Sequence, residues 1–455
     1  MTKNYLLTLS IALLSFSLTS QSNPAILYWL MNTTGETGSH YVSGNPTEIQ
    51  DNDSVNVQTV LYSDNWVYIR TKGIPSYPTG PYLDGNPTVA TNQNAIFKFP
   101  LYPVENTGTP TATNGGNIGV FINGVALFDY RDGVSWNNNS GAEGGGPIPG
   151  PPGQGIWNRD AIVAEREGFD CSKGHPAMGN YHHHQNPSAF DLDLVVISDI
   201  CNLYDADGLY VIDQQAHSPL LGFAYDGFPV YGAYGYLNAD GTGGIVRMKS
   251  SYQLRNITER THYADGTDVT DGPDVSVDYP LGRYREDYEY IEHPGEDDYL
   301  DEHNGRFCVT PEYPDGIYAY FCTVDINHNS AYPYVVGPTF YGTKVAAKVT
   351  SITEPVTLYD GTPSELSELR TNEFSIGVYP NPASDFIAIQ NKGLVQDKIE
   401  IRLYTSDGKM VRSSSISAGS TISYIDTSTL YDGEYIIEFL WGNSRTSKKV
   451  ILTRS

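Results

Sequence analysis

The chain has 455 residues and a formal net charge of -26 at pH 7, with 53 Asp and Glu residues against 27 Lys and Arg residues. This acidic balance excludes a non-specific nucleic-acid binder, because such a protein needs basic surface to contact phosphates. The 35 Tyr, 45 Gly and 28 Pro residues favour short strands joined by turn-rich loops over long helices. We therefore expect a mainly β protein (a β-rich α+β fold) with long loops and few short helices.

Residues 1–20 have the pattern of a secretory signal peptide. Lys3 precedes an apolar run from Tyr5 to Leu18, and small polar residues then lead to a cleavage position before Gln21. The run is too short for a membrane anchor, and no cysteine follows it to carry a lipid. No later stretch approaches the length of a membrane span. The sequence thus predicts an exported protein with no transmembrane segment.

Apolar and polar residues alternate in several segments that follow. The predicted elements are strands at 55–61 and 66–70, a hairpin of 118–122 with 125–128, an exposed irregular loop at 139–155, and a short helix at 159–167. Asn123-Gly124 suits a type I′ turn in the hairpin, and Asn158 is the expected N-cap of the helix. Residues 188–200 fit either a helix or a strand.

Four cysteines occur in the chain, and an exported protein is expected to oxidise them. Three pairings are possible. We favour Cys171–Cys201 with Cys308–Cys322, because short loops close most easily. Free buried thiols are the alternative.

Acidic residues dominate 259–302, which indicates a solvated insertion; calcium binding is the less favoured interpretation. Residues 316–323 are expected to form a buried aromatic strand. A connector rich in Ser, Thr, Pro and Glu follows at 350–373. Beyond it, about seven short alternating segments over 374–455 predict a small immunoglobulin-like β-sandwich.

The C-terminal segment carries recognisable motifs, namely Val378-Tyr379-Pro380-Asn381-Pro382, Leu403-Tyr404-Thr405-Ser406-Asp407-Gly408-Lys409, Leu430-Tyr431-Asp432-Gly433-Glu434-Tyr435 and a basic end at Lys448-Lys449. It resembles the type IX secretion sorting domain (type A) of Bacteroidetes. The resemblance implies the type IX secretion machinery as a partner, and a protein that is secreted or attached to the outer-membrane surface. It implies nothing about activity.

The main part of the chain carries a second set of motifs between about residues 66 and 342. They are Gly174-His175-Pro176, Tyr181-His182-His183-His184, His217-Ser218-Pro219-Leu220, Asp226-Gly227-Phe228-Pro229-Val230-Tyr231-Gly232, His303-Asn304-Gly305-Arg306, Thr310-Pro311-Glu312-Tyr313-Pro314-Asp315-Gly316, Tyr318-Ala319-Tyr320-Phe321 and Tyr332-Pro333-Tyr334. Together they resemble the YHYH family, although His183 replaces the second Tyr of its signature. We expect a YHYH domain at 21–349, a linker at 350–373 and a sorting domain at 374–455.

The densest group of histidines lies at 175–184. Side chains two residues apart share one face of a strand, so His182 and His184 point together while Tyr181 and His183 point to the other side. A His-x-His pair suits a transition metal, and copper or zinc is the metal that we expect to bind. His175 and His217 are the further candidate ligands. Histidines bonded to carbonyls and tyrosines, or metal-free acid–base chemistry, are the alternatives.

Two carboxylates inside the matched motifs, Asp226 and Glu312, are candidates to orient an imidazole or to act as a general base. Asp226 also fits a purely structural turn with Gly227. Tyrosines of the same motifs are candidates for sugar stacking or for buried packing; they are Tyr181, Tyr231, Tyr318 and Tyr320. The sequence thus favours a secreted or surface protein that binds a transition metal. An extracellular glycan-binding or adhesive module without metal chemistry is the alternative.

Overall fold

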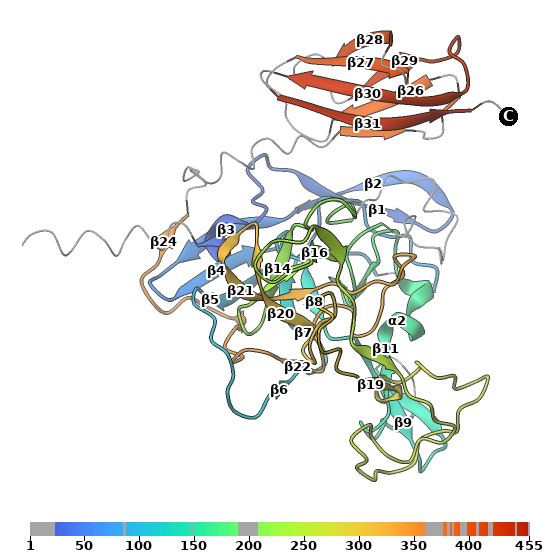
Figure 1. The fold of residues 1–455 in the computed structure, drawn as a ribbon. Coiled ribbons are helices and arrows are strands. Elements are labelled where there is room, and N and C mark those ends of the chain that lie inside the picture. Colours follow the sequence, from blue (N-terminus) through green and yellow to red (C-terminus); the bar gives the residue numbers. More distant parts are fainter. Residues whose placement is uncertain are drawn as a thin grey trace, which may run out of the picture. The chain divides into compact units, whose positions relative to one another are not determined.

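The computed structural model describes most of the chain. The described residues are 23–84, 88–146, 148, 150–189, 208–359, 376–379, 383–384, 386–391, 398–405, 409–416, 422–441 and 444–453. The predicted signal peptide, Cys201 and nearly all of 188–200 lie outside them. The chain divides into two compact units, Met1–Thr362 and Pro363–Ser455, and both are built of strands (Figure 1). The predicted mainly β fold is confirmed.

An eight-stranded mixed sheet is the largest element of the first unit. Its strands, in spatial order, are β12 (Gly174–Ala177), β13 (Asn180–His183), β8 (Ala126–Phe128), β7 (Asn117–Phe121), β14 (Leu220–Ala224), β15 (Pro229–Tyr231), β21 (Tyr313–Phe321) and β20 (Gly305–Thr310). The β13–β8 and β15–β21 pairs are parallel, and the others are antiparallel. The histidine-rich hairpin therefore forms one edge of this sheet, and the β20–β21 hairpin forms the other.

A five-stranded antiparallel sheet provides the second layer. Its strands are β23 (Ala347–Val349), β5 (Ala95–Pro100), β4 (Trp66–Thr71), β3 (Val57–Tyr62) and β24 (Thr357–Leu358). The strands expected at 55–61 and 66–70 correspond to β3 and β4. β24 falls within the segment expected as a linker, and it pairs with β3.

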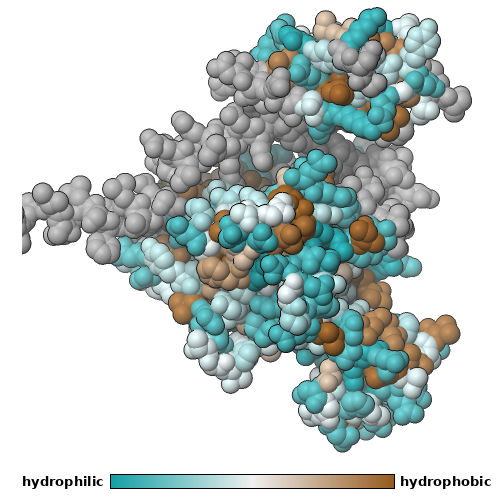
Figure 2. Space-filling view, viewed as in Figure 1, coloured by the Kyte–Doolittle hydropathy of each residue, from teal (hydrophilic) through white to brown (hydrophobic). Residues whose placement is uncertain are grey.

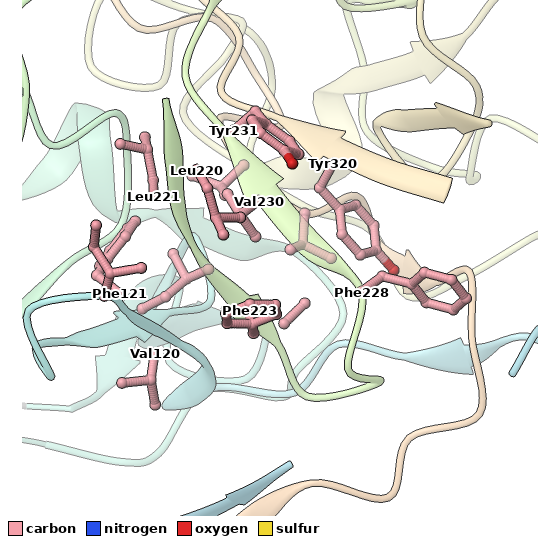
Figure 3. Packing of buried hydrophobic residues seen from close by; sticks show 14 of the residues in the cluster. Val120, Phe121, Leu220, Leu221, Phe223, Phe228, Val230, Tyr231 and Tyr320 are labelled. Atoms are coloured by element: carbon pink, nitrogen blue, oxygen red, sulfur yellow. The ribbon is translucent and has the colours of Figure 1, made fainter. Parts of the chain in front are cut away.

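Aromatic side chains join these two sheets in one core. Phe99 of β5 lies 6.3 Å from Phe223 of β14 between ring centroids, and Trp29 contacts both rings at 5.7 and 5.4 Å. Figure 3 shows how the side chains of β7, β14 and β15 pack side by side in this cluster. Burial of this surface is the main force that holds the sheets face to face.

Smaller elements surround the two sheets. They are the helices α1 (Pro24–Leu27) and α2 (Ala161–Ala164), a sheet of β10 (Ala142–Gly145), β9 (Arg131–Asn137) and β11 (Asn158–Asp160), and the strand pairs β1 (Thr37–Val42) with β2 (Asn45–Ser54), β16 (Tyr234–Tyr236) with β17 (Ile245–Arg247), β18 (Tyr252–Leu254) with β19 (Tyr288–Tyr290), and β22 (Thr339–Phe340) with β6 (Thr111–Ala112). The lobe that contains β9, β11 and β19 extends from the body of this unit (Figure 1).

The acidic segment 259–302 contains a buried ion pair between two of its own residues, and Arg283 of the segment also pairs with Glu143 of β10. Arg260 and Asp287 are both inaccessible, and Arg260 Nε donates to Asp287 Oδ1 at 2.7 Å. Many of the other acidic residues of the segment remain exposed. The face of the molecule in Figure 2 is largely hydrophilic, with apolar side chains in small groups. No helix among the described residues has the length and apolar character needed to cross a bilayer.

Three local predictions need correction. The 118–128 hairpin exists, but Asn123 is not among the non-glycine residues with positive φ, so the turn is not type I′. The expected loop at 139–155 includes β10, which pairs with β9 through Ala142–Gly145. The expected helix at 159–167 is shorter: Asp160 rather than Asn158 caps α2, accepting from Ile162 N at 2.8 Å, and a 3-10 turn follows at Arg166–Gly168.

The predicted Cys308–Cys322 disulfide is also wrong, because both residues are buried free thiols. The register explains this result. Cys308 on β20 lies opposite Ile317 on β21, so Cys322 lies five residues further along the ladder, on the order of 17 Å away. That separation is too long for a disulfide. The Cys171–Cys201 bond stays a prediction, because Cys201 is outside the described residues.

The second unit is a small β-sandwich, as expected. One sheet has the order β25 (Ile376–Tyr379), β26 (Phe386–Asn391) and β29 (Ile422–Asp426); the other has β28 (Met410–Ile416), β27 (Ile399–Thr405), β30 (Gly433–Trp441) and β31 (Ser444–Leu452). Alternate aliphatic residues of β27 are buried in the common core of this unit, as the alternation in the sequence predicts; they are Ile399, Ile401 and Leu403.

Candidate metal centre

The β12–β13 hairpin places two histidines directly opposite each other. Its turn residues, Met178 and Gly179, both have positive φ (49° and 84°), which defines a type I′ turn. A Cβ on Gly179 would come within 2.0 Å of Thr91 Oγ1, so glycine is required there. The resulting register pairs His175 with His182, and side chains of such a pair share one face of the sheet.

His184 completes a cluster with this pair. Its Nε2 lies 3.1 Å from His182 Nε2 and 3.4 Å from His175 Nε2. All three side chains are buried, and their ligand atoms lie within 4.8 Å of one another. Among the described residues, these three histidines are the group whose potential ligand atoms lie close enough together to bind one metal ion. The structure thus brings together three of the four predicted histidines.

Backbone carbonyl groups show which ring nitrogens of His182 and His184 carry a proton. His182 Nδ1 lies 2.8 Å from the carbonyl of Asn180, and His184 Nδ1 lies 2.5 Å from the carbonyl of Asp129. A carbonyl only accepts, so each Nδ1 carries a proton and each Nε2 of a neutral ring has a lone pair. Two such Nε2 atoms cannot hydrogen-bond to each other. Their close approach is compatible with a metal ion between them.

Burial keeps these imidazoles neutral. Burial lowers the pKa of His184 to about 4, and it lowers the pKa of His182 and of His175 well below the usual value, with neighbouring histidines adding to the effect. A proton is therefore a poor occupant near neutral pH. The neutral imidazole is the form that ligates metals.

Aromatic rings hold the imidazoles in place. Phe128 stacks on His182, with ring centroids 3.7 Å apart and an angle of 19° between the planes. Phe169 meets His175 edge-on at 4.7 Å. The carboxylate of Asp129, whose carbonyl accepts from His184, is paired with Arg131 at 2.5 Å. The positions of the three donor atoms are thus fixed by packing on several sides.

The opposite face of β13 is arranged differently. His183 Nδ1 donates to the carbonyl of Lys173 at 3.1 Å, so its Nε2 accepts from the Tyr77 hydroxyl at 2.7 Å. The Tyr181 hydroxyl donates to Asp170 at 2.9 Å. Strand alternation had predicted that His183 points away from His182 and His184, and this prediction is confirmed.

Glu165 is the residue of the cluster that the sequence reasoning missed. Its Oε2 lies 3.4 Å from His175 Nε2 and 3.6 Å from His184 Nε2. Burial, with Asp132 as the strongest neighbouring charge, raises the pKa of Glu165 to about 8. Glu165 follows α2, which is fixed by the bond from Ala161 N to the carbonyl of Tyr130. No signal in the sequence separates Glu165 from Glu167.

The other predicted site residues lie elsewhere, which corrects their assignment to this cluster. His217 precedes β14, donates to the carbonyl of Ser218 at 2.7 Å, and lies 5.2 Å from the ring of Tyr231. Glu312 is in the β20–β21 turn and accepts from the Tyr231 hydroxyl at 2.9 Å. β21 is five strand spacings from β13, on the order of 20 Å.

Asp226 has a structural role in a turn, which was the alternative to a catalytic role. It is fully buried in the β14–β15 turn, where Oδ2 accepts from the Tyr320 hydroxyl at 2.6 Å and from Gly342 N at 2.8 Å. Burial raises its pKa to about 6. The tyrosines considered for sugar stacking are at most 2% exposed, which leaves their faces inaccessible to a glycan; they are Tyr181, Tyr231, Tyr318 and Tyr320.

The comparisons with known proteins agree with the architecture. Residues 96–333 match the YHYH protein family, and because this is more than half of the sequence, the chain belongs to that family. Residues 377–453 match the secretion system C-terminal sorting domain, so the protein is secreted or attached to the cell surface. No curated relative matches the chain. The wider limits of 21–349, 350–373 and 374–455 remain our proposal for the domain boundaries.

Proposed function

We propose that this secreted YHYH protein binds a transition metal, copper or zinc, through the Nε2 atoms of His175, His182 and His184. The observation that carries the proposal is the 3.1 Å approach of two Nε2 lone pairs whose Nδ1 protons are both committed to carbonyls. A divalent metal bound to both nitrogens turns this electrostatic conflict into two coordinate bonds.

The chemistry of the donors selects the class of metal. Three imidazoles suit zinc and copper, whereas calcium and magnesium require oxygen ligands. The bonds from His182 and His184 to backbone carbonyls fix the tautomer and the ring orientation, which is the usual support around a metal-bound histidine. The acidic groups that surround Glu165 favour a cation over an anion at this position.

The test is metal analysis of protein produced without a histidine tag. We expect one equivalent of copper or zinc per chain after gel filtration, retained against a weak chelator. The double variant His182→Ala/His184→Ala should lower the affinity by more than about 100-fold, because loss of even an outer-shell partner typically costs about 10–100-fold. A matched control is His217→Ala, which lies apart from the cluster and should keep wild-type affinity.

Two results would refute the proposal. One is wild-type protein that retains neither metal after loading and gel filtration. The other is a double variant whose affinity equals that of the wild type, because the bound metal would then be held elsewhere. Circular dichroism of each variant establishes that a loss of metal does not come from unfolding.

A further inference from the structure

We infer that the Glu165 carboxylate is the fourth ligand of this metal and the one that exchanges with an incoming small molecule. The inference rests on the proposed metal site and goes beyond it by assigning the position at which chemistry can occur. It starts from Glu165 Oε2, which lies 3.4 Å from His175 Nε2 and 3.6 Å from His184 Nε2.

These distances are those of neighbouring donors around one metal. Zinc binds nitrogen and oxygen at about 2.0–2.2 Å, so two donors of a tetrahedral site lie about 3.3 Å apart. Four of the six separations among these donors are 3.1, 3.4, 3.4 and 3.6 Å, and Glu165 Oε2 makes its two with His175 and His184. All four lie close to the expected value.

The same distances argue against a base that acts on a metal-bound water. In that arrangement the water occupies the fourth position, and the base lies within about 3 Å of the water. The carboxylate oxygen would then be roughly 4.5 Å from the two nearest histidine nitrogens. Glu165 Oε2 is about 1 Å nearer than this, which fits the place of the ligand itself better.

Glu165 is also the donor that faces solvent. Its side chain is 23% exposed, against 9% for His175 and 3% for His184. The three imidazoles belong to the sheet edge and are held by carbonyls and aromatic rings, whereas Glu165 stands at the end of a four-residue helix. Displacement of a ligand is easiest where solvent reaches it and packing holds it least. An incoming oxygen or nitrogen donor therefore replaces the carboxylate and leaves the histidines in place.

The experiment uses the full chain loaded with Co²⁺ for spectroscopy and with Zn²⁺ for affinity, and azide as the small probe ligand. The variants are Glu165→Gln and Glu165→Ala, with Glu167→Gln as the matched control, since Glu167 is an exposed carboxylate two residues away. His184→Ala reports on the histidine site itself. The metal-free variants are compared by circular dichroism and thermal unfolding.

We expect both Glu165 variants to bind one equivalent of metal with an affinity lower by at least about 10–100-fold, the loss that even an outer-shell partner causes. The visible bands of their Co²⁺ forms should change, and azide should bind more tightly than to the wild type, because no carboxylate competes with it. Glu167→Gln should match the wild type in all three measurements.

Failure of the Glu165 inference can be distinguished from failure of the proposed metal site. If the Glu165 variants keep wild-type affinity, Co²⁺ spectrum and azide binding while His184→Ala loses metal, the inference is wrong and the histidine site stands. If their affinity falls but the Co²⁺ spectrum is unchanged, Glu165 acts through its charge and is not a ligand, which also overturns the inference. If the wild type binds no metal, both the inference and the proposed function fail.

Discussion

The two faces of the β12–β13 hairpin contain buried histidines whose Nε2 atoms meet different partners. On one face, His182 and His184 direct their Nε2 lone pairs toward each other at 3.1 Å. On the other face, Nε2 of His183 accepts a hydrogen bond from the Tyr77 hydroxyl at 2.7 Å, so that ring has a partner for both nitrogens. Burial is nearly complete on both faces.

This difference is the one by which we propose to separate a metal ligand from a structural histidine. The Nδ1 atoms of His182, His183 and His184 all donate to backbone carbonyls, so Nδ1 does not distinguish them. What distinguishes them is the group that meets Nε2: a hydroxyl donor on one face, and further imidazoles with a carboxylate on the other. A hydroxyl satisfies the lone pair, whereas imidazoles and a carboxylate supply more lone pairs and leave room for a cation.

Removing one histidine from each face tests this difference most directly. His175→Ala should lower zinc affinity by at least about 10–100-fold, the loss that even an outer-shell partner causes. His183→Ala should leave zinc affinity within about twofold, yet lower the free energy of unfolding by about 2–4 kcal/mol, through a cavity and an unsatisfied Tyr77 hydroxyl. Chelator competition and urea unfolding of the metal-free proteins measure the two quantities. Equal loss of zinc affinity in both variants would contradict the assignment of faces.

A clash on the His183 face that shifts the whole hairpin should produce both effects. A Cβ on Gly174 would lie 2.3 Å from the Tyr181 hydroxyl oxygen and 2.9 Å from His183 Cε1, so Gly174→Ala forces the hairpin to shift. We expect a loss of about 1–3 kcal/mol in the free energy of unfolding, with weaker zinc binding. Urea unfolding with and without zinc tests this prediction, and unchanged values in both would show that the hairpin has room for the methyl group.

Removing only the hydroxyl donor gives a smaller effect. Tyr77→Phe leaves Nε2 of His183 without its donor and should reduce the free energy of unfolding by about 1–2 kcal/mol. Zinc affinity should be unchanged, because Tyr77 is on the face away from the cluster. A large fall in affinity would mean that the two faces are coupled through β13.

The pH dependence of stability gives a further test of the His183 face. Burial lowers the pKa of His183 to about 3, against about 6.5 in the unfolded chain. Between these values the unfolded state binds a proton that the folded state does not, so stability falls as pH falls. In chelator, His183→Ala should reduce this slope by up to about 1.4 kcal/mol per pH unit between pH 6.5 and 4. Denaturation at pH 7, 6 and 5 measures it, and equal slopes would contradict the shifted pKa.

Local patterns predicted much of the fold. Alternation of aliphatic and polar residues placed β3, β4 and the strands of the sorting domain, and it also assigned His182 and His184 to one face of β13. These features depend on neighbours in sequence, since side chains of a strand alternate whatever its partners are. The motifs of the two families established export and membership in the YHYH family, because they are spread over most of each domain.

Contacts between segments distant in sequence decided which of the predicted site residues and cysteines lie together. Sheet order separates β13 from β21, which moved Glu312 away from the histidines and left His217 and Asp226 in other surroundings, although all three are in motifs of the same family. The β20–β21 register kept Cys308 and Cys322 apart. Glu165 reached the cluster only because α2 is tied to the end of β8 through Tyr130. The sequence thus determined which imidazoles share a face, whereas the tertiary structure brought Glu165 beside them, since contacts between distant segments leave no periodic pattern in the chain.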